Sequence, residues 1–142
     1  MQRAILILAI TATLGLLTAA QVQESTPMKV EAATAPIYPQ LAILSATGGD
    51  VVVQVKINAE GDVTSAKVVD GHKLLREASL NAARQWRFSS GEAGREAQLT
   101  FSFRVMPKNT SQIELTPIFK PPYRVEVRRV IPEIPSNPGQ GE

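Results

Sequence analysis

Aliphatic side chains stand at every second position from Val51 to Ile57, and this alternation is the strongest constraint on the fold. Successive side chains of a β-strand point to opposite faces, so the segment predicts a strand with one buried face. Asn58-Ala59-Glu60-Gly61 follows, with a glycine where a hairpin turn needs a positive φ. Val63–Val69 then returns as a second strand, and a slip in its alternation near Ser65 indicates a β-bulge. A third alternating run, Leu99–Val105, predicts a third strand.

Two helices are expected on either side of the hairpin. Pro39 suits the first turn of a short helix, which Gly48-Gly49 ends. After the hairpin, Asp70 is expected to cap a longer helix, whose apolar stripe comprises Leu75, Ala78, Ser79, Ala82 and Trp86. The order helix, hairpin, helix, strand predicts an α+β fold, in which helices cover one face of a small antiparallel sheet.

A further strand is expected beyond this domain. Tyr123, Val125 and Val127 alternate with charged residues and predict a strand over 123–129, and a short strand is expected over 113–118. The predicted division is a domain over 36–106, an extension with added strands over 107–131, and a disordered Pro/Gly tail over 132–142. The added strand either covers the edge of the sheet or leaves that edge open.

The first residues resemble a secretory signal. Arg3 precedes an apolar run, and Thr18-Ala19-Ala20 supplies the small residues that signal peptidase prefers, so cleavage is expected after residue 20. The alternative is an inner-membrane anchor over residues 4–20, near the lower limit of about 17 residues for a spanning helix. Residues 21–35 then read as a short tether, without the Pro-rich repeats of a stiff spacer.

Composition argues against several classes of function. The chain has a net charge of +2 with interspersed charges and no cysteine, which argues against nucleic-acid binding and excludes thiol chemistry. His72 is the single histidine and is expected to be a turn residue at a helix start. No phosphate-binding loop or nucleophile elbow is visible. We therefore expect no enzyme activity, no cofactor, no metal site and no small-molecule substrate.

Several marks along the chain together resemble the C-terminal domain of TonB, over residues 36–105. They are Tyr38-Pro39 before the short helix, Gly49 before the first strand, Gly61 in the hairpin, Gly71-His72-Lys73-Leu74-Leu75, the stretch from Ala78 to Ala83, and Trp86-Arg87-Phe88. The resemblance implies a periplasmic binding module of the cell envelope without an active site. It further implies a link to TonB-dependent transmembrane transport across the outer membrane.

The resemblance also implies where a partner binds. In the family, the segment before the Tyr-Pro pair and the last strand of the domain receive a peptide by strand addition. The corresponding residues here are Ala35, Pro36, Ile37, Tyr38, Leu99, Thr100, Phe101, Ser102, Phe103 and Arg104. The expected partner is a peptide of an outer-membrane receptor or transporter, or another envelope protein. Ala35 stands where well-studied members carry a glutamine.

Other readings of the same features remain open. The domain could be a structural subunit of an envelope assembly that forms a homodimer by pairing or exchanging strands, without transducing energy. An enzyme is the third and weakest reading. Trp86 is expected in the core rather than stacked on a ligand. Arg87 is expected to be a solvated cation at a helix end, or else to meet a carboxylate of the partner.

Overall fold

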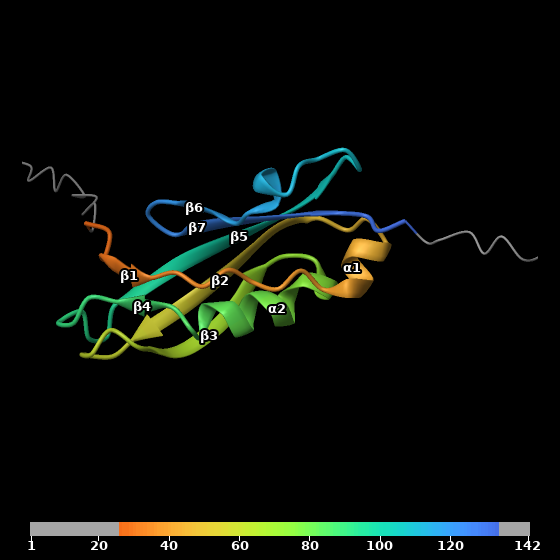
Figure 1. Ribbon diagram of the computed structural model, residues 1–142. Helices are drawn as coiled ribbons and strands as arrows, with labels where there is room; N and C mark the ends of the chain where they lie inside the picture. The colour runs from red at the N-terminus through yellow and green to blue at the C-terminus, as the bar shows by residue number, and fades with distance from the viewer. Residues whose placement is uncertain (1–25, 134–142) are drawn as a thin grey trace, which may run out of the picture.

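The computed structural model describes residues 26–133, which form a curved sheet with helices against one face (Figure 1). The large sheet has five strands in the order β3-β2-β5-β7-β6, and a small sheet pairs β1 with β4. The elements are β1 (Val30–Ala32), α1 (Gln40–Leu44), β2 (Gly49–Ile57), β3 (Val63–Asp70), α2 (Lys73–Ala83), β4 (Arg87–Phe88), β5 (Glu96–Met106), the 3-10 helix η1 (Ile113–Leu115), β6 (Ile118–Lys120) and β7 (Arg124–Val130).

The β2–β3 hairpin forms as its alternation predicts. Gly61 has a φ of 88°, and a Cβ at this position would lie 1.9 Å from the carbonyl oxygen of Phe88, so only glycine fits this turn. The pairing shifts at Thr64, beside the bulge predicted near Ser65. A second shift at Val69, which the sequence did not indicate, bends the far end of β3.

Helix α2 begins and ends differently from the prediction. Its cap is His72, whose Nδ1 accepts a hydrogen bond of 3.2 Å from the backbone N–H of Leu74, so the prediction of Asp70 was wrong. Asp70 remains within β3, where it pairs with Val52. The helix ends at Ala83, and Trp86 lies in the connection to β4 rather than on the helix. Four of its residues, Leu75, Ser79, Ala82 and Ala83, are buried.

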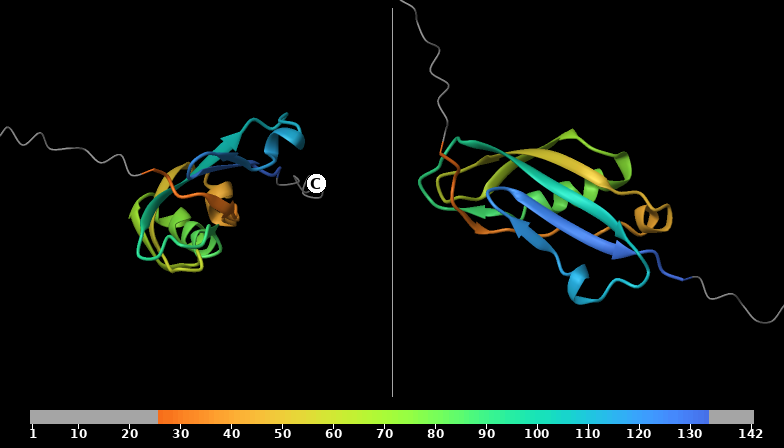
Figure 2. Two further views of the ribbon diagram at one scale, coloured as in Figure 1. Left: turned by 90° about the vertical axis from the view of Figure 1, so that its left-hand side faces the viewer. Right: turned by 90° about the horizontal axis from the view of Figure 1, so that it is seen from above.

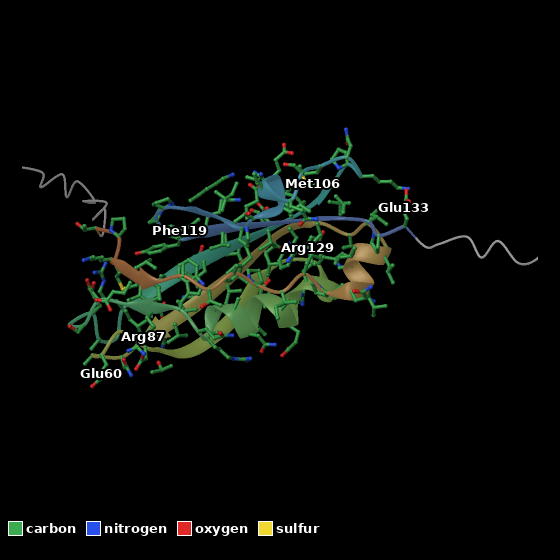
Figure 3. All side chains as sticks on the ribbon, in the orientation of Figure 1. Glu60, Arg87, Met106, Phe119, Arg129 and Glu133 are labelled. Atoms are coloured by element: carbon green, nitrogen blue, oxygen red, sulfur yellow. The ribbon has the colours of Figure 1, made fainter. Side chains whose placement is uncertain are left out.

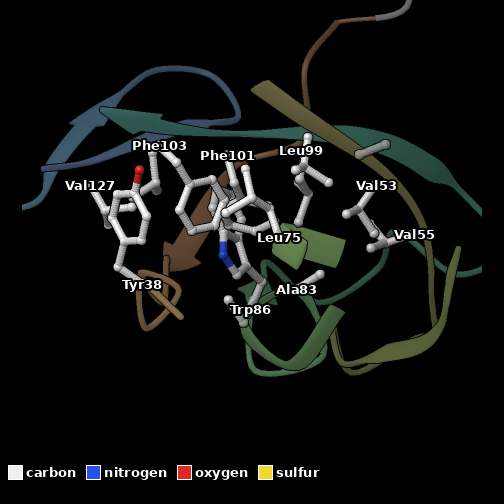
Figure 4. Close-up of a cluster of buried hydrophobic side chains, with 14 of the residues drawn as sticks. Tyr38, Val53, Val55, Leu75, Ala83, Trp86, Leu99, Phe101, Phe103 and Val127 are labelled. Carbon is white, nitrogen blue, oxygen red and sulfur yellow. The ribbon is translucent and has the colours of Figure 1, made fainter. Parts of the chain in front are cut away.

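The core lies between α2 and the large sheet, and Trp86 is at its centre (Figure 4). The indole is 1% exposed, and its ring lies 6.0 Å from that of Phe101 in a T-shaped arrangement. Its Nε1 donates a 2.9 Å hydrogen bond to the carbonyl of Thr34. Tyr38 extends the aromatic cluster, with its ring 5.1 Å from that of Phe103. The expectation that Trp86 is a core residue is confirmed.

The tether predicted over 21–35 is wrong for the part that the structure describes. Met28 is 3% exposed and belongs to the core, and β1 pairs with β4. The tether prediction failed because β1 has only three residues, too few for a periodic pattern. The predicted signal peptide lies outside the described residues, as do residues 134–142 of the predicted tail.

The C-terminal extension becomes part of the large sheet (Figure 2). Strand β7 pairs with β5 in parallel, so the sheet is mixed, whereas the part formed by β2, β3 and β5 is antiparallel as expected. The strand expected over 113–118 is wrong: η1 occupies its first half, and β6 begins only at Ile118. In residues 26–133, no helix is long and apolar enough to cross a membrane.

The central place of Trp86 leads to a prediction. Trp86→Ala removes the indole from the core and its bond to Thr34, and we expect a loss of roughly 3 to 5 kcal/mol in the free energy of unfolding. Denaturant melts measure this loss. Trp86→Phe is the control, because it keeps an aromatic ring and should lose less of the free energy of unfolding. A loss below about 1 kcal/mol, typical of a surface position, would contradict the assignment.

Candidate functional site

The edge of β5, one of the two predicted binding surfaces, is closed by the chain itself. Strand β5 pairs with β2 on one side and with β7 on the other, where Thr100 stands opposite Arg124 and Phe103 opposite Val127. The amide of Thr100 donates to the carbonyl of Tyr123 at 2.9 Å. Leu99–Arg104 therefore offer no open edge, and of the two outcomes left open by the sequence, the added strand covers the edge.

Side chains on both faces of the sheet hold β7 against β5. Toward the helices, Val125 and Val127 are 3% and 1% exposed. On the opposite face, Nη1 of Arg124 donates to Oδ2 of Asp50 at 3.0 Å and to Oγ of Ser102 at 2.7 Å. These contacts join β7 to β2 and β5, so β7 is an integral strand of the sheet.

Two carboxylates on this polar face are stabilised in their charged form. Burial raises the pKa of Asp50, but the Ser102 hydroxyl, Arg124 and the charge of Arg104 outweigh it, so the pKa lies below its ordinary value of 3.8. Glu126 accepts hydrogen bonds of 2.6 Å from Lys120 and from Arg128. These two cations lower the pKa of Glu126 below its ordinary value of 4.5.

The two outer strands of the large sheet are poor templates for an added strand. Strand β6 has three residues between Pro117 and Pro121, and proline cannot donate to a ladder. Strand β3 carries its two bulges and the exposed Lys67, which are common means of protecting an edge. Backbone pairing with a partner is thus disfavoured at both edges.

The segment Ala35–Tyr38, the other predicted binding surface, has free backbone groups. It runs in an extended form from β1 to α1 (Figure 1), as expected for residues that precede prolines. Within residues 26–133, the amides of Ala35, Ile37 and Tyr38 have no hydrogen-bond partner. The side chain of Ile37 is 84% exposed.

Both ends of this segment are firmly attached. On one side, the indole of Trp86 binds the carbonyl of Thr34. On the other, the hydroxyl of Tyr38 donates to the carbonyl of Thr47 at 2.6 Å, and burial raises the pKa of this phenol above its ordinary value of 10.0. Both ends of the segment that carries the free amides are therefore fixed to the rest of the fold.

A groove of about 330 Å³ lies between this segment and α2. Its lining residues are Ala35, Pro36, Ile37, Pro39, Leu74, Glu77, Ala78, Asn81, Ala82 and Gln85. Sequence reasoning missed it, because it treated Ala78 and Ala82 as parts of one core stripe. In the structure Ala82 is buried whereas Ala78 and Leu74 remain partly exposed, a distinction that periodicity does not make.

The remaining candidates from the sequence have structural roles. His72 caps α2, and Arg87 forms a 3.1 Å ion pair with Asp62 at the hairpin end of the molecule (Figure 3). Arg87 therefore has a partner within its own chain. In the part of the chain that the structure describes, no cluster of three metal-ligating side chains occurs.

Comparison with known proteins identifies one family. Residues 34–106 match the family model described as Gram-negative bacterial TonB protein C-terminal. The match ends at the last residue of β5, so β6 and β7 lie beyond it. A solution NMR structure of the Pseudomonas aeruginosa TonB CTD is similar, with 22% identity, 61% of this chain and 95% of that chain covered, and a TM-score of 0.46. No curated protein sequence matches the chain.

Removal of the extension tests the closed edge. A chain that ends at Lys108 lacks β6 and β7, so we expect faster hydrogen exchange across Leu99–Val105 and a gain of dimer or peptide binding through the exposed backbone groups. A chain that ends at Ile131 keeps both strands and is the control. Unchanged protection of Leu99–Val105 in the shorter chain would contradict this expectation.

The lowered pKa values predict a loss of stability in acid. A carboxyl whose pKa falls on folding stabilises the protein above its ordinary pKa, and this contribution disappears as the pH falls through the folded value. For Asp50 and Glu126 the loss therefore lies below their ordinary values of 3.8 and 4.5.

Denaturant melts between neutral pH and about pH 3 measure this loss. We expect Asp50→Asn to have a lower free energy of unfolding than wild type at neutral pH. On acidification, this variant should lose less of that free energy than wild type does. Glu60→Gln, at an exposed hairpin position, is the control and should follow wild type. Parallel pH profiles of Asp50→Asn and wild type would exclude a role for Asp50.

Proposed function

Since the chain belongs to the Gram-negative bacterial TonB protein C-terminal family, we propose that it is a periplasmic protein-binding module. Domains of this family make envelope-protein interactions related to TonB-dependent transport, and they are interaction modules rather than enzymes. In our proposal the partner is a peptide of an outer-membrane transporter or another envelope protein. It pairs with the backbone of Ala35–Tyr38, and no cofactor takes part.

The observation that carries this proposal is the row of free amides beside the exposed side chain of Ile37. Backbone pairing needs unpaired N–H and C=O groups on an extended chain. The five-stranded sheet offers few, because β7 covers β5 and the outer strands are short or bulged. Ala35–Tyr38 is extended, and within residues 26–133 its amides at Ala35, Ile37 and Tyr38 have no partner.

The attachment of the segment favours binding. A flexible loop must lose conformational entropy when a partner orders it, which weakens the complex. Here the bonds from Trp86 to Thr34 and from Tyr38 to Thr47 fix both ends beforehand. A peptide can then pair with the segment without reorganising it.

The location follows from the same proposal. A cleaved signal over residues 1–20 delivers the domain to the periplasm, and an anchor over residues 4–20 would place it there on the inner membrane. The structural-subunit reading is a homodimer formed by pairing or exchanging strands. Pairing through β5 has less support, because β7 already occupies that edge.

Substitution at Ile37 separates backbone pairing from side-chain contact. Ile37→Pro removes one amide from an extended, exposed position, and Ile37→Ala keeps the amide but removes most of the side chain. We expect calorimetric titration with peptides from co-encoded outer-membrane transporters to show strong loss of binding for Ile37→Pro. Ile37→Ala should keep most of the affinity.

Thermal melts of both variants provide the folding control. If both variants lose the same amount of peptide affinity, the partner recognises the side chain rather than the backbone. Absence of binding by the wild-type protein to peptides from every co-encoded transporter would reject the transporter as partner and favour the structural-subunit reading.

A further inference from the structure

We infer that the groove between Ala35–Pro39 and α2 selects an extended partner segment that carries an apolar side chain and, within two residues of it, a lysine or arginine. This inference rests on the proposed function and adds the chemistry of the partner. Three features support it: the shape of the groove, the spacing of its lining residues along α2, and the single charged side chain at its rim.

The shape results from small side chains on one face of α2. Leu74, Ala78 and Ala82 follow one another at intervals of four residues and form the floor. The methyl groups of the two alanines leave room between the helix and the wall formed by Pro36 and Ile37. A groove lined in this way accepts an apolar side chain, and the burial of that side chain releases the water around it.

The spacing of the groove matches an extended chain. Four residues of an α-helix advance about 6 Å along its axis, and two residues of a strand advance about 6.6 Å. Figure 1 shows Ala35–Pro39 running alongside α2, so a peptide paired with this segment follows the helix. Every second side chain of the peptide then reaches a successive turn of α2.

Glu77 supplies the charge. It is the one ionisable side chain among the ten lining residues, and Asn81 and Gln85 continue the same rim. In residues 26–133 Glu77 forms no ion pair. A cation on the partner would complement it, whereas an acidic residue would be repelled.

The exposure of Glu77 limits the size of this effect. An exposed ion pair contributes about 0.2 to 1 kcal/mol, which corresponds to roughly a 1.4- to 5-fold change in affinity. The charge of Glu77 therefore acts mainly on the choice between partners. The apolar side chain that enters the groove beside Ala78 contributes more of the binding free energy.

The inference is tested with two labelled heptapeptides of alternating valine and threonine. One peptide carries a lysine beside the central valine, the other carries a glutamate there, and the two are otherwise identical. Fluorescence anisotropy with the full chain measures both affinities at low and high salt. We expect the lysine peptide to bind about two- to fivefold more tightly at low salt, with the difference reduced at high salt.

Three variants locate the effect. Glu77→Lys should reverse the order of the two peptides, and Ala78→Leu should weaken both by filling the groove. Glu60→Gln removes an exposed carboxylate at the end of the molecule opposite α1 (Figure 3) and should leave both affinities unchanged. Thermal melts confirm that each variant is folded.

The inference is overturned if the two peptides bind equally, if neither binds, or if Ala78→Leu and Glu77→Lys bind as wild type does. None of these results by itself rejects the proposed function, which the Ile37 pair of variants tests separately. A transporter peptide that is sensitive to Ile37→Pro but indifferent to Glu77→Lys would leave the function standing without this selectivity.

Discussion

The burial of Trp86 is the interaction on which the rest of the structure depends. Its ring lies about 6 Å from Phe101 of β5, Phe88 of β4 and Phe119 of β6, and its Nε1 binds the carbonyl of Thr34. One side chain thus joins the family domain, the C-terminal extension and the segment that leads into Ala35–Tyr38. The aromatic contacts exclude water, and the indole N–H would be costly to bury without the Thr34 carbonyl.

The extension changes what the family domain can offer to a partner. The family match ends with β5, where the chain would leave a row of unpaired backbone groups, and β7 pairs with them in parallel. The ion pairs of Arg124 and the buried Val125 and Val127 make this pairing part of the fold. In the proposed function, the partner therefore pairs with Ala35–Tyr38 rather than with the sheet, and this segment lies beside the groove on α2. Closure of the edge also protects the protein from pairing with other copies of itself.

The pattern of the sequence predicted most of the large sheet and little of the groove. The alternation in β2, β5 and β7 is strong because each strand has one face in the core, and Gly61 marks the hairpin. The cap at His72, the strands β1 and β4, and the 3-10 helix η1 were missed. These elements are short, so their positions depend on contacts with distant residues rather than on a repeating pattern. Met28 illustrates this, since its side chain belongs to the core and its backbone exchanges hydrogen bonds with the hydroxyl of Tyr123, a residue far away in the sequence.

The sequence by itself determined the α+β class, the strands that carry the core, the central place of Trp86 and the family to which the domain belongs. These features are encoded locally, in side-chain periodicity and in glycines at required turns. Only the tertiary structure decided that β7 lies parallel to β5, that the edge along Leu99–Arg104 is closed, and that the amides of Ala35–Tyr38 are free beside α2. A strand shows in its own residues that one face is buried, but not which neighbour will pair with its backbone. Every residue carries the same N–H and C=O groups, so that choice depends on how distant side chains pack.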